Sequence, residues 1–446
     1  MDQATKHGRN VSRSTRPRSS TKGPLDGPDD PLNIEDSGTH IYSNPHGADQ
    51  ELYTGASFTL LDPLAPKELS SEVEKDLSFL LRYDNYQSLS QVEIPHALRS
   101  EFISPTSEES LGSSLSTLEK ILAEGRFLLA AHLCAAILMS SLISPTDIKL
   151  IFALFYTRLA CLELSGNVLI AAQESKTLED LSSNFYYVDS APKAASTATD
   201  HQSYPRHIAP WPLRVLAVRL QSIGFSDPRR GIAGLYEIGM EARREIMRPD
   251  LDPGEREIWR QRLSDLGIRA VNALVEMGDL DAAKRSLESL RRTEPGNETT
   301  KLRMVLLLLL IGDLDAAGQL CESFGDTRNA IFSPLLSMAE GRYEDAVSEW
   351  RALLANKDKT TDDAVISQNL AVCLLYTGRL SEARQILETL VQTSHCFASL
   401  VFNLATVYEL CSDKAMQLKH ELVETIAKQP VTGNTNLDRP NADFKL

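Results

Sequence analysis

The sequence lacks long hydrophobic runs and has no excess of positive charge. Its longest apolar run, residues 304–311, is far shorter than the roughly 20 residues that a membrane-spanning helix needs, so we expect a buried helix there. The formal net charge is −15 and the pI is near 5.2. Nucleic-acid binding and attraction to anionic membranes both need clustered basic charge. We therefore expect a protein that binds no nucleic acid and reaches membranes only through partners.

Motifs that carry chemistry are also missing. The six cysteines contain no Cys-x-x-Cys pair and lie in apolar helical patterns, which predicts buried free thiols in a reducing compartment. The sequence has no glycine-rich phosphate loop, His-Glu-x-x-His, Gly-x-Ser-x-Gly or dinucleotide fingerprint. The nine histidines are scattered rather than clustered as metal ligands. We predict a protein that is not an enzyme, with no catalytic residue, cofactor or metal site.

The first 50 residues differ from the rest. They are rich in Ser, Thr, Pro, Gly and charge, and residues 1–23 carry six basic side chains against one acidic one. Such a composition cannot bury enough apolar surface to fold, which predicts a disordered basic tail over 1–50. Contact of this tail with an acidic partner or a membrane surface is the alternative. No apolar segment of a secretory signal is seen there, so we expect a cytoplasmic protein.

The remaining chain divides by periodicity. We expect an irregular, partly ordered segment over 51–112 that packs on the body or on a partner. Apolar residues then recur with helical spacing, which predicts helical hairpins over 113–185 and a solenoid over 210–429. An Ala/Ser/Thr/Pro-rich interval at 186–209 is predicted to be a loop, and 430–446 a flexible tail.

A Gly-x-x-x-x-Ala pattern recurs six times, each time between two apolar helical stretches. The copies pair Gly125 with Ala130, Gly166 with Ala171, Gly278 with Ala283, Gly312 with Ala317, Gly341 with Ala346 and Gly378 with Ala383. Glycine can end a helix in the left-handed conformation, and alanine five residues later lets the next helix pack closely. The interval between the third and fourth copies is 34 residues, the tetratricopeptide (TPR) period. A last copy has Ser412 and Gln417 in the two positions, as expected of a terminal repeat.

These repeats predict an all-α, TPR-like helical-repeat solenoid that binds other proteins in a concave groove lined by the first helix of each hairpin. Polar residues lie nine positions before the turn in four of the later hairpins: Arg269, Arg303, Asn369 and Asn403. They are our candidates for a protein-binding groove. In the alternative interpretation, the arginines are solvated and the asparagines form hydrogen bonds between repeats.

Several segments resemble a known family. They are PWPLRVL (210–216), IWRQRL (258–263), NLAVCLLYTGRLSEARQILETLV (369–391) and SLVFNLATVYELCSDKAMQLK (399–419). They are similar to subunit twelve of the trafficking protein particle (TRAPP) complex over about 210–419. Two further pieces, 80–95 and 171–186, look like fungal members of this family.

The resemblance implies a role in a tethering complex that is also a guanine-nucleotide exchange factor for a Rab GTPase. It implies work in ER-to-Golgi vesicle traffic and autophagy, at a cytoplasmic location peripheral to the Golgi apparatus and ER–Golgi vesicles. In this family exchange is carried by the small core subunits, so the resemblance implies a scaffold with other TRAPP subunits as partners and only indirect contact with the Rab. An independent TPR adaptor or co-chaperone that binds partner peptides is the alternative.

Overall fold

The computed structural model describes residues 61–65, 75–89, 110–189, 205–249, 251–293, 298–324, 326–355, 363–393, 395 and 397–428. The predicted tails at 1–50 and 430–446 lie outside these residues. The described chain is almost entirely α-helical. Its helices are α3 (Leu111–Ala123), α4 (Phe127–Met139), α5 (Ile148–Leu164), α6 (Val168–Ser175), α7 (Trp211–Gly224), α8 (Pro228–Ile246), α9 (Pro253–Met277), α10 (Leu280–Thr293), α11 (Glu298–Ile311), α12 (Leu314–Cys321), α13 (Asp326–Ala339), α14 (Tyr343–Ala355), α15 (Asp363–Tyr376), α16 (Leu380–Gln392), α17 (Ala398–Cys411) and α18 (Ala415–Lys428).

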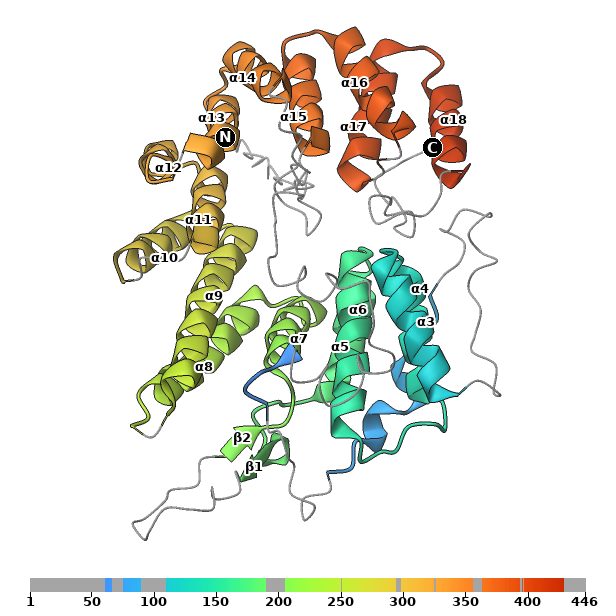
Figure 1. Ribbon diagram of the computed structural model, residues 1–446, viewed down its shortest axis with the longest axis vertical. Coiled ribbons are helices and arrows are strands. Elements are labelled where there is room, and N and C mark those ends of the chain that lie inside the picture. Colours follow the sequence, from blue (N-terminus) through green and yellow to red (C-terminus); the bar gives the residue numbers. More distant parts are fainter. Residues whose placement is uncertain are drawn as a thin grey trace, which may run out of the picture.

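The helices form consecutive hairpins, α3/α4 through α17/α18, and each hairpin packs on its neighbours along the chain. In Figure 1 the hairpins from α9/α10 onward follow an arc, and the block α3–α7 lies below it. Helices α9, α11, α13, α15 and α17 lie on the inner side of this arc, with α10, α12, α14 and α16 on the outer side. The protein is a TPR-like helical-repeat solenoid, as the sequence predicts.

The turn inside six of the hairpins has a recurrent geometry. All six glycines of the repeat pattern have positive φ, between 75° and 86°. At Gly278 the glycine N–H donates to Val275 O at 2.9 Å, and the next N–H donates to Leu274 O at 3.0 Å. Equivalent pairs of hydrogen bonds occur at the other five glycines. This is the Schellman arrangement, which satisfies the last carbonyls of the first helix and requires a left-handed residue.

The alanine of each pattern is completely buried. The six alanines without exposed surface are Ala130, Ala171, Ala283, Ala317, Ala346 and Ala383. In each of them the backbone N–H also donates to the carbonyl of the residue four positions earlier, which closes the first turn of the second helix. A methyl side chain at this point keeps that turn close to the first helix. The turn and the close contact are therefore built from the same six-residue pattern.

The α7/α8 hairpin has a turn that the sequence pattern misses. Ser226 takes the glycine position, with φ 53°, and Asp227 N donates to Ser222 O at 2.9 Å. The alanine position is Gly231, where a Cβ would lie 2.6 Å from the Cβ of Ser222. The same geometry is thus achieved with serine at the turn and glycine at the close contact. The terminal turn differs again, because Ser412 is extended rather than left-handed.

Four hydrophobic clusters follow one another along the solenoid. They join α3–α7, α7–α9, α8–α12 and α11–α18 in turn. Leu128 of α4 belongs to the last cluster, and Leu89 packs against both the first and the last. The N-terminal hairpins therefore touch the C-terminal repeats as well as their neighbours in sequence.

The predicted loop at 186–209 is ordered at both ends, which the sequence did not indicate. Strand β1 (Tyr187–Asp189) pairs antiparallel with β2 (Pro205–His207), and Tyr187 lies opposite His207. Ala209 N–H donates to His207 Nδ1 at 3.0 Å, so Nε2 carries the proton and donates to Leu181 O at 2.9 Å. Burial, and secondarily Arg214, lower the pKa of His207 to about 3. A neutral histidine thus fastens this small sheet to the body.

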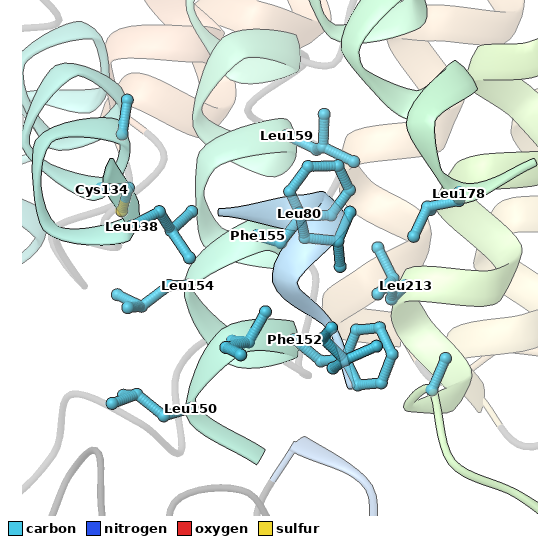
Figure 2. Packing of buried hydrophobic residues seen from close by; sticks show 14 of the residues in the cluster. Leu80, Cys134, Leu138, Leu150, Phe152, Leu154, Phe155, Leu159, Leu178 and Leu213 are labelled. Atoms are coloured by element: carbon cyan, nitrogen blue, oxygen red, sulfur yellow. The ribbon is translucent and has the colours of Figure 1, made fainter. Parts of the chain in front are cut away.

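The segment 75–89 packs into the N-terminal hairpins, within the region predicted to be irregular. It contains two short 3₁₀ helices, η1 (Ser78–Leu80) and η2 (Tyr83–Asn85). Leu77 and Leu80 are fully buried, and Figure 2 shows Leu80 among Phe155, Leu159 and Leu178. Apolar side chains therefore anchor this segment to α5 and its neighbours.

A buried ion pair fixes the same segment. Arg158 on α5 donates from Nε and Nη2 to the carboxylate of Glu174 on α6, at 2.6 and 2.5 Å. Nη1 and Nη2 also donate to the carbonyls of Ala131 and Gln87, at 2.6 and 3.1 Å. Gln87 N–H returns a hydrogen bond to Glu174 at 3.0 Å. Because the buried charges are paired and hydrogen-bonded, removing either partner would leave an uncompensated charge.

Candidate protein-binding surface

The four candidate groove residues lie on the first helices of their hairpins, which form the inner side of the arc (Figure 1). The structure connects two of them through one carboxylate. Asp265 accepts from Arg269 Nε at 2.6 Å and from Arg303 Nη1 at 2.9 Å. These arginine side chains are 44% and 28% exposed. Asp265 thus joins α9 to α11 and holds both guanidinium groups at the surface, where solvent screens them.

The two asparagines are placed differently. Asn369 on α15 is buried, whereas Asn403 on α17 is half-buried. Beside Asn369, Gln368 donates to Ser399 at 2.9 Å, which connects α15 to α17. The burial of Asn369 favours the alternative in which such amides serve packing between repeats. The pair of arginines is therefore the better-exposed part of the candidate groove.

Exposed apolar side chains mark a second surface on the terminal hairpin. Phe402 and Leu410 of α17 are 41% and 59% exposed, and Met416 of α18 is 58% exposed. Apolar residues there favour contact with another protein. In the sequence this hairpin differs from the others only by Ser412 and Gln417 in the pattern positions. That difference does not indicate an exposed apolar surface.

A third surface lies on α8. Tyr236, Met240 and Met247 are exposed and spaced by four and seven residues, so they lie on one face of the helix. Arg243 and Arg244 are on the same helix. Aromatic, methionine and arginine side chains are enriched at protein interfaces. The repeat pattern does not indicate this stripe, because it marks the turns and close helix contacts and not the outward-facing positions.

Three of the five cysteines in the described residues are buried, and Cys321 is half-buried. Cys134, Cys161 and Cys373 are buried, and burial raises the pKa of the Cys134 thiol to about 12. Such thiols stay protonated and unreactive at neutral pH. Cys411 is exposed, contrary to the prediction, because α17 ends there in the last described hairpin. Cys396 lies outside the described residues.

The described residues contain no group of three or more His, Cys, Asp or Glu side chains that could hold a metal ion. None of the helices in that part of the chain is both long and apolar enough to cross a membrane.

Two known proteins similar to this chain are orthologous subunits of one complex. The chain is 27% identical over 187 residues to trafficking protein particle complex subunit 12 of Homo sapiens, covering 38% of this chain and 25% of the human protein. It is 43% identical over 70 residues to the same subunit of Mus musculus, covering 15% of this chain and 9% of the mouse protein. The chain thus matches a quarter or less of the length of these relatives. No family model matches it.

Among solved structures, the TPR domain of P58(IPK) matches with a TM-score of 0.20 and 11% sequence identity. The match covers 74% of this chain and 95% of that domain.

Proposed function

We propose that this chain is a non-catalytic scaffold subunit of a TRAPP-type tethering and Rab guanine-nucleotide exchange complex. The similarity over 187 residues to TRAPP complex subunit 12 is the observation that carries the proposal. In this proposal the protein acts in ER-to-Golgi vesicle traffic and autophagy. It lies in the cytoplasm at the periphery of the Golgi and ER–Golgi vesicles, binds other subunits directly and meets the Rab GTPase only through them.

The physical case for a scaffold comes from the solenoid. Its hairpins bury their apolar faces against one another, which leaves the inner side and the ends of the array available to partners. The exposed apolar residues lie on α8 and on α17/α18, and these helices are well separated in Figure 1. Two such surfaces would let one rigid subunit hold two neighbours at a fixed separation.

The proposal is tested by gentle affinity purification of the tagged chain from its native cells. The complex is sized by gel filtration, and its components are identified by mass spectrometry. We expect co-elution with TRAPP core and large subunits. Elution near the monomer mass, or with chaperones alone, would refute the proposal and favour the independent TPR adaptor.

Paired surface variants locate the contacts. Phe402→Ser/Leu410→Ser and Met240→Ser/Met247→Ser each remove apolar side chains from one candidate surface. Tyr83→Ser is the control, because Tyr83 is 81% exposed but lies on neither surface. Each double variant should lose a different subset of subunits, whereas the control should retain them all. Retention of every subunit by both double variants would exclude these surfaces.

The arginine pair is tested with Asp265 as the discriminating residue. If the arginines bind a partner, Arg269→Gln/Arg303→Gln weakens co-purification, whereas Asp265→Asn removes only the carboxylate that they share and does not. If they serve only the solenoid, neither variant changes the partners. In either case the loss of exposed ion pairs costs roughly 0–1 kcal/mol in stability, so unfolding would not explain a lost partner.

A further inference from the structure

An arginine on α9 lies between two tryptophans. The indole rings of Trp211 on α7 and Trp259 on α9 meet edge to face, with centroids 5.4 Å apart. The Arg262 guanidinium lies 4.8 Å from the centroid of each ring. Its side chain is only 10% exposed. Aromatic faces attract a cation most strongly when water is excluded, so the two indoles hold the guanidinium in place, and its positive charge can bind an anion.

A carboxylate from a distant part of the chain occupies this site. Asp62 Oδ1 forms an ion pair with Arg262, and Oδ2 accepts from the backbone N–H of Trp211 at 2.9 Å. Asp62 is itself only 6% exposed. The neighbouring Arg214 is paired with Glu241, Nη1 to Oε1 at 3.0 Å. The carboxylate of Glu241 is therefore already paired with Arg214.

The contact with Trp211 also caps a helix. Helix α7 begins after Pro210, which offers no side-chain cap, and Pro212 has no N–H. Asp62 supplies the missing acceptor from 149 residues away. A carboxylate at a helix N-terminus is favoured both by the free N–H group and by the helix dipole. The start of α7 thus selects an acidic ligand.

The contacts extend beyond Asp62 to Leu64, the second residue after it. Leu64 packs against the α7–α9 cluster, and its N–H donates to Asp62 Oδ1 at 2.9 Å. Arg206 Nη1 lies 3.5 Å from the carbonyl oxygen of Leu64. Pro63 between them is exposed. The site therefore contacts an aspartate and a leucine that are separated by one exposed residue.

We propose that Trp211, Trp259 and Arg262 form a binding site for a short Asp-x-Leu peptide, occupied in cis by residues 61–65 of this chain. The bound segment acts as a strap that ties α7 to α9. This inference uses no property of the TRAPP complex and stands or falls separately from the proposed function.

Peptide binding in trans tests the proposal. In the full chain, Asp62→Ala/Leu64→Ala removes the ligand and leaves the site intact. Because Trp211 and Trp259 lose their covering, we expect their fluorescence to shift to longer wavelength, while Trp350, fully buried in another cluster, gives a constant background. A peptide of residues 58–67 should reverse the shift saturably. It should bind the doubly substituted chain at least tenfold more tightly than does the same peptide with asparagine for aspartate. The 58–67 peptide should bind the unsubstituted chain at least tenfold more weakly than it binds the doubly substituted chain.

Two controls separate this result from general damage. Asp84→Asn breaks an exposed ion pair with Arg82 in the same N-terminal region and should leave the fluorescence and peptide binding unchanged. No saturable binding to the doubly substituted chain, or equal binding of both peptides, would overturn the site. If the 58–67 peptide binds the unsubstituted chain as tightly as the doubly substituted chain, the site is not occupied in cis by residues 61–65.

A second measurement covers the case in which the double variant does not fold. A protease site introduced within residues 66–74 allows the folded, otherwise native chain to be cut after purification. We expect the fragment that ends in this interval to remain bound during gel filtration, and to dissociate when the chain carries Asp62→Asn. A fragment that dissociates from both chains, or from neither, would refute the role of the Asp62 contact.

Discussion

Two glycines in one hairpin should respond in opposite ways to the same substitution. Gly312 ends α11 with φ at 86°, and a Cβ built there meets nothing within 4 Å. Gly318 lies within α12 without a positive φ, and its Cβ would lie 3.7 Å from Cδ2 of Leu336, an ordinary van der Waals distance. Steric crowding is therefore small in both alanine variants, and backbone conformation decides the outcome.

The magnitudes follow from the two backbones. An alanine in the left-handed region costs roughly 1–2 kcal/mol, partly offset by roughly 0.4–1 kcal/mol from the lower entropy of its unfolded chain. Gly312→Ala should therefore destabilise by about 1 kcal/mol. Gly318→Ala should stabilise by roughly 0.5–1 kcal/mol, because glycine within a helix is unfavourable relative to alanine. The two variants should differ by about 1.5–2 kcal/mol.

Urea unfolding followed by far-UV circular dichroism measures this difference. The parent midpoint should fall between those of the two variants, with unchanged slopes. Gly312→Asn should destabilise less than Gly312→Ala, because asparagine tolerates the left-handed region. Equal midpoints for Gly312→Ala and the parent, or a Gly318→Ala variant that is equally destabilised, would refute this account of the turns.

Three further predictions concern packing, buried charge and pH. Ala283→Leu should overpack its hairpin and cost roughly 1–3 kcal/mol in thermal unfolding, whereas Ala352→Leu, at an exposed position of α14, should cost little. Glu174→Gln should destabilise the protein by roughly 3–5 kcal/mol in urea, because it leaves Arg158 as an uncompensated buried charge. The pKa of His207 is lowered in the folded state, so the unfolded state binds the extra proton between about pH 6.5 and 3, and stability should fall with decreasing pH across this window by up to about 1.4 kcal/mol per pH unit.

Matched measurements separate these effects from general destabilisation. Asp84→Asn removes one partner of an ion pair whose side chains are well exposed, so its cost should be at most about 1 kcal/mol. His207→Asn should flatten the pH dependence of the urea midpoint relative to the parent. An unflattened profile would show that other groups produce it. If Ala283→Leu melts like the parent, the assigned register of the repeat is wrong.

The sequence by itself determined the repeat. Glycine at a left-handed turn and alanine at a close helix contact are local requirements, so Gly278 and Ala283 identify their hairpin without any knowledge of its neighbours. The same logic missed the turn at Ser226, because serine in the left-handed region and Gly231 at the close contact satisfy the geometry with different residues.

Only the tertiary structure decided which polar residues are exposed and where the N-terminal segments bind. Helical spacing placed Arg303 and Asn369 at equivalent repeat positions, yet one is at the surface beside Asp265 and the other is buried. Asp62 lies 200 residues from Arg262 in the sequence, and Gln87 lies 71 residues from Arg158. The local sequence pattern indicates where each helix ends and which of its faces is buried. Contacts over such separations depend on how successive hairpins are stacked, which is set by the summed packing of many side chains and by no single motif.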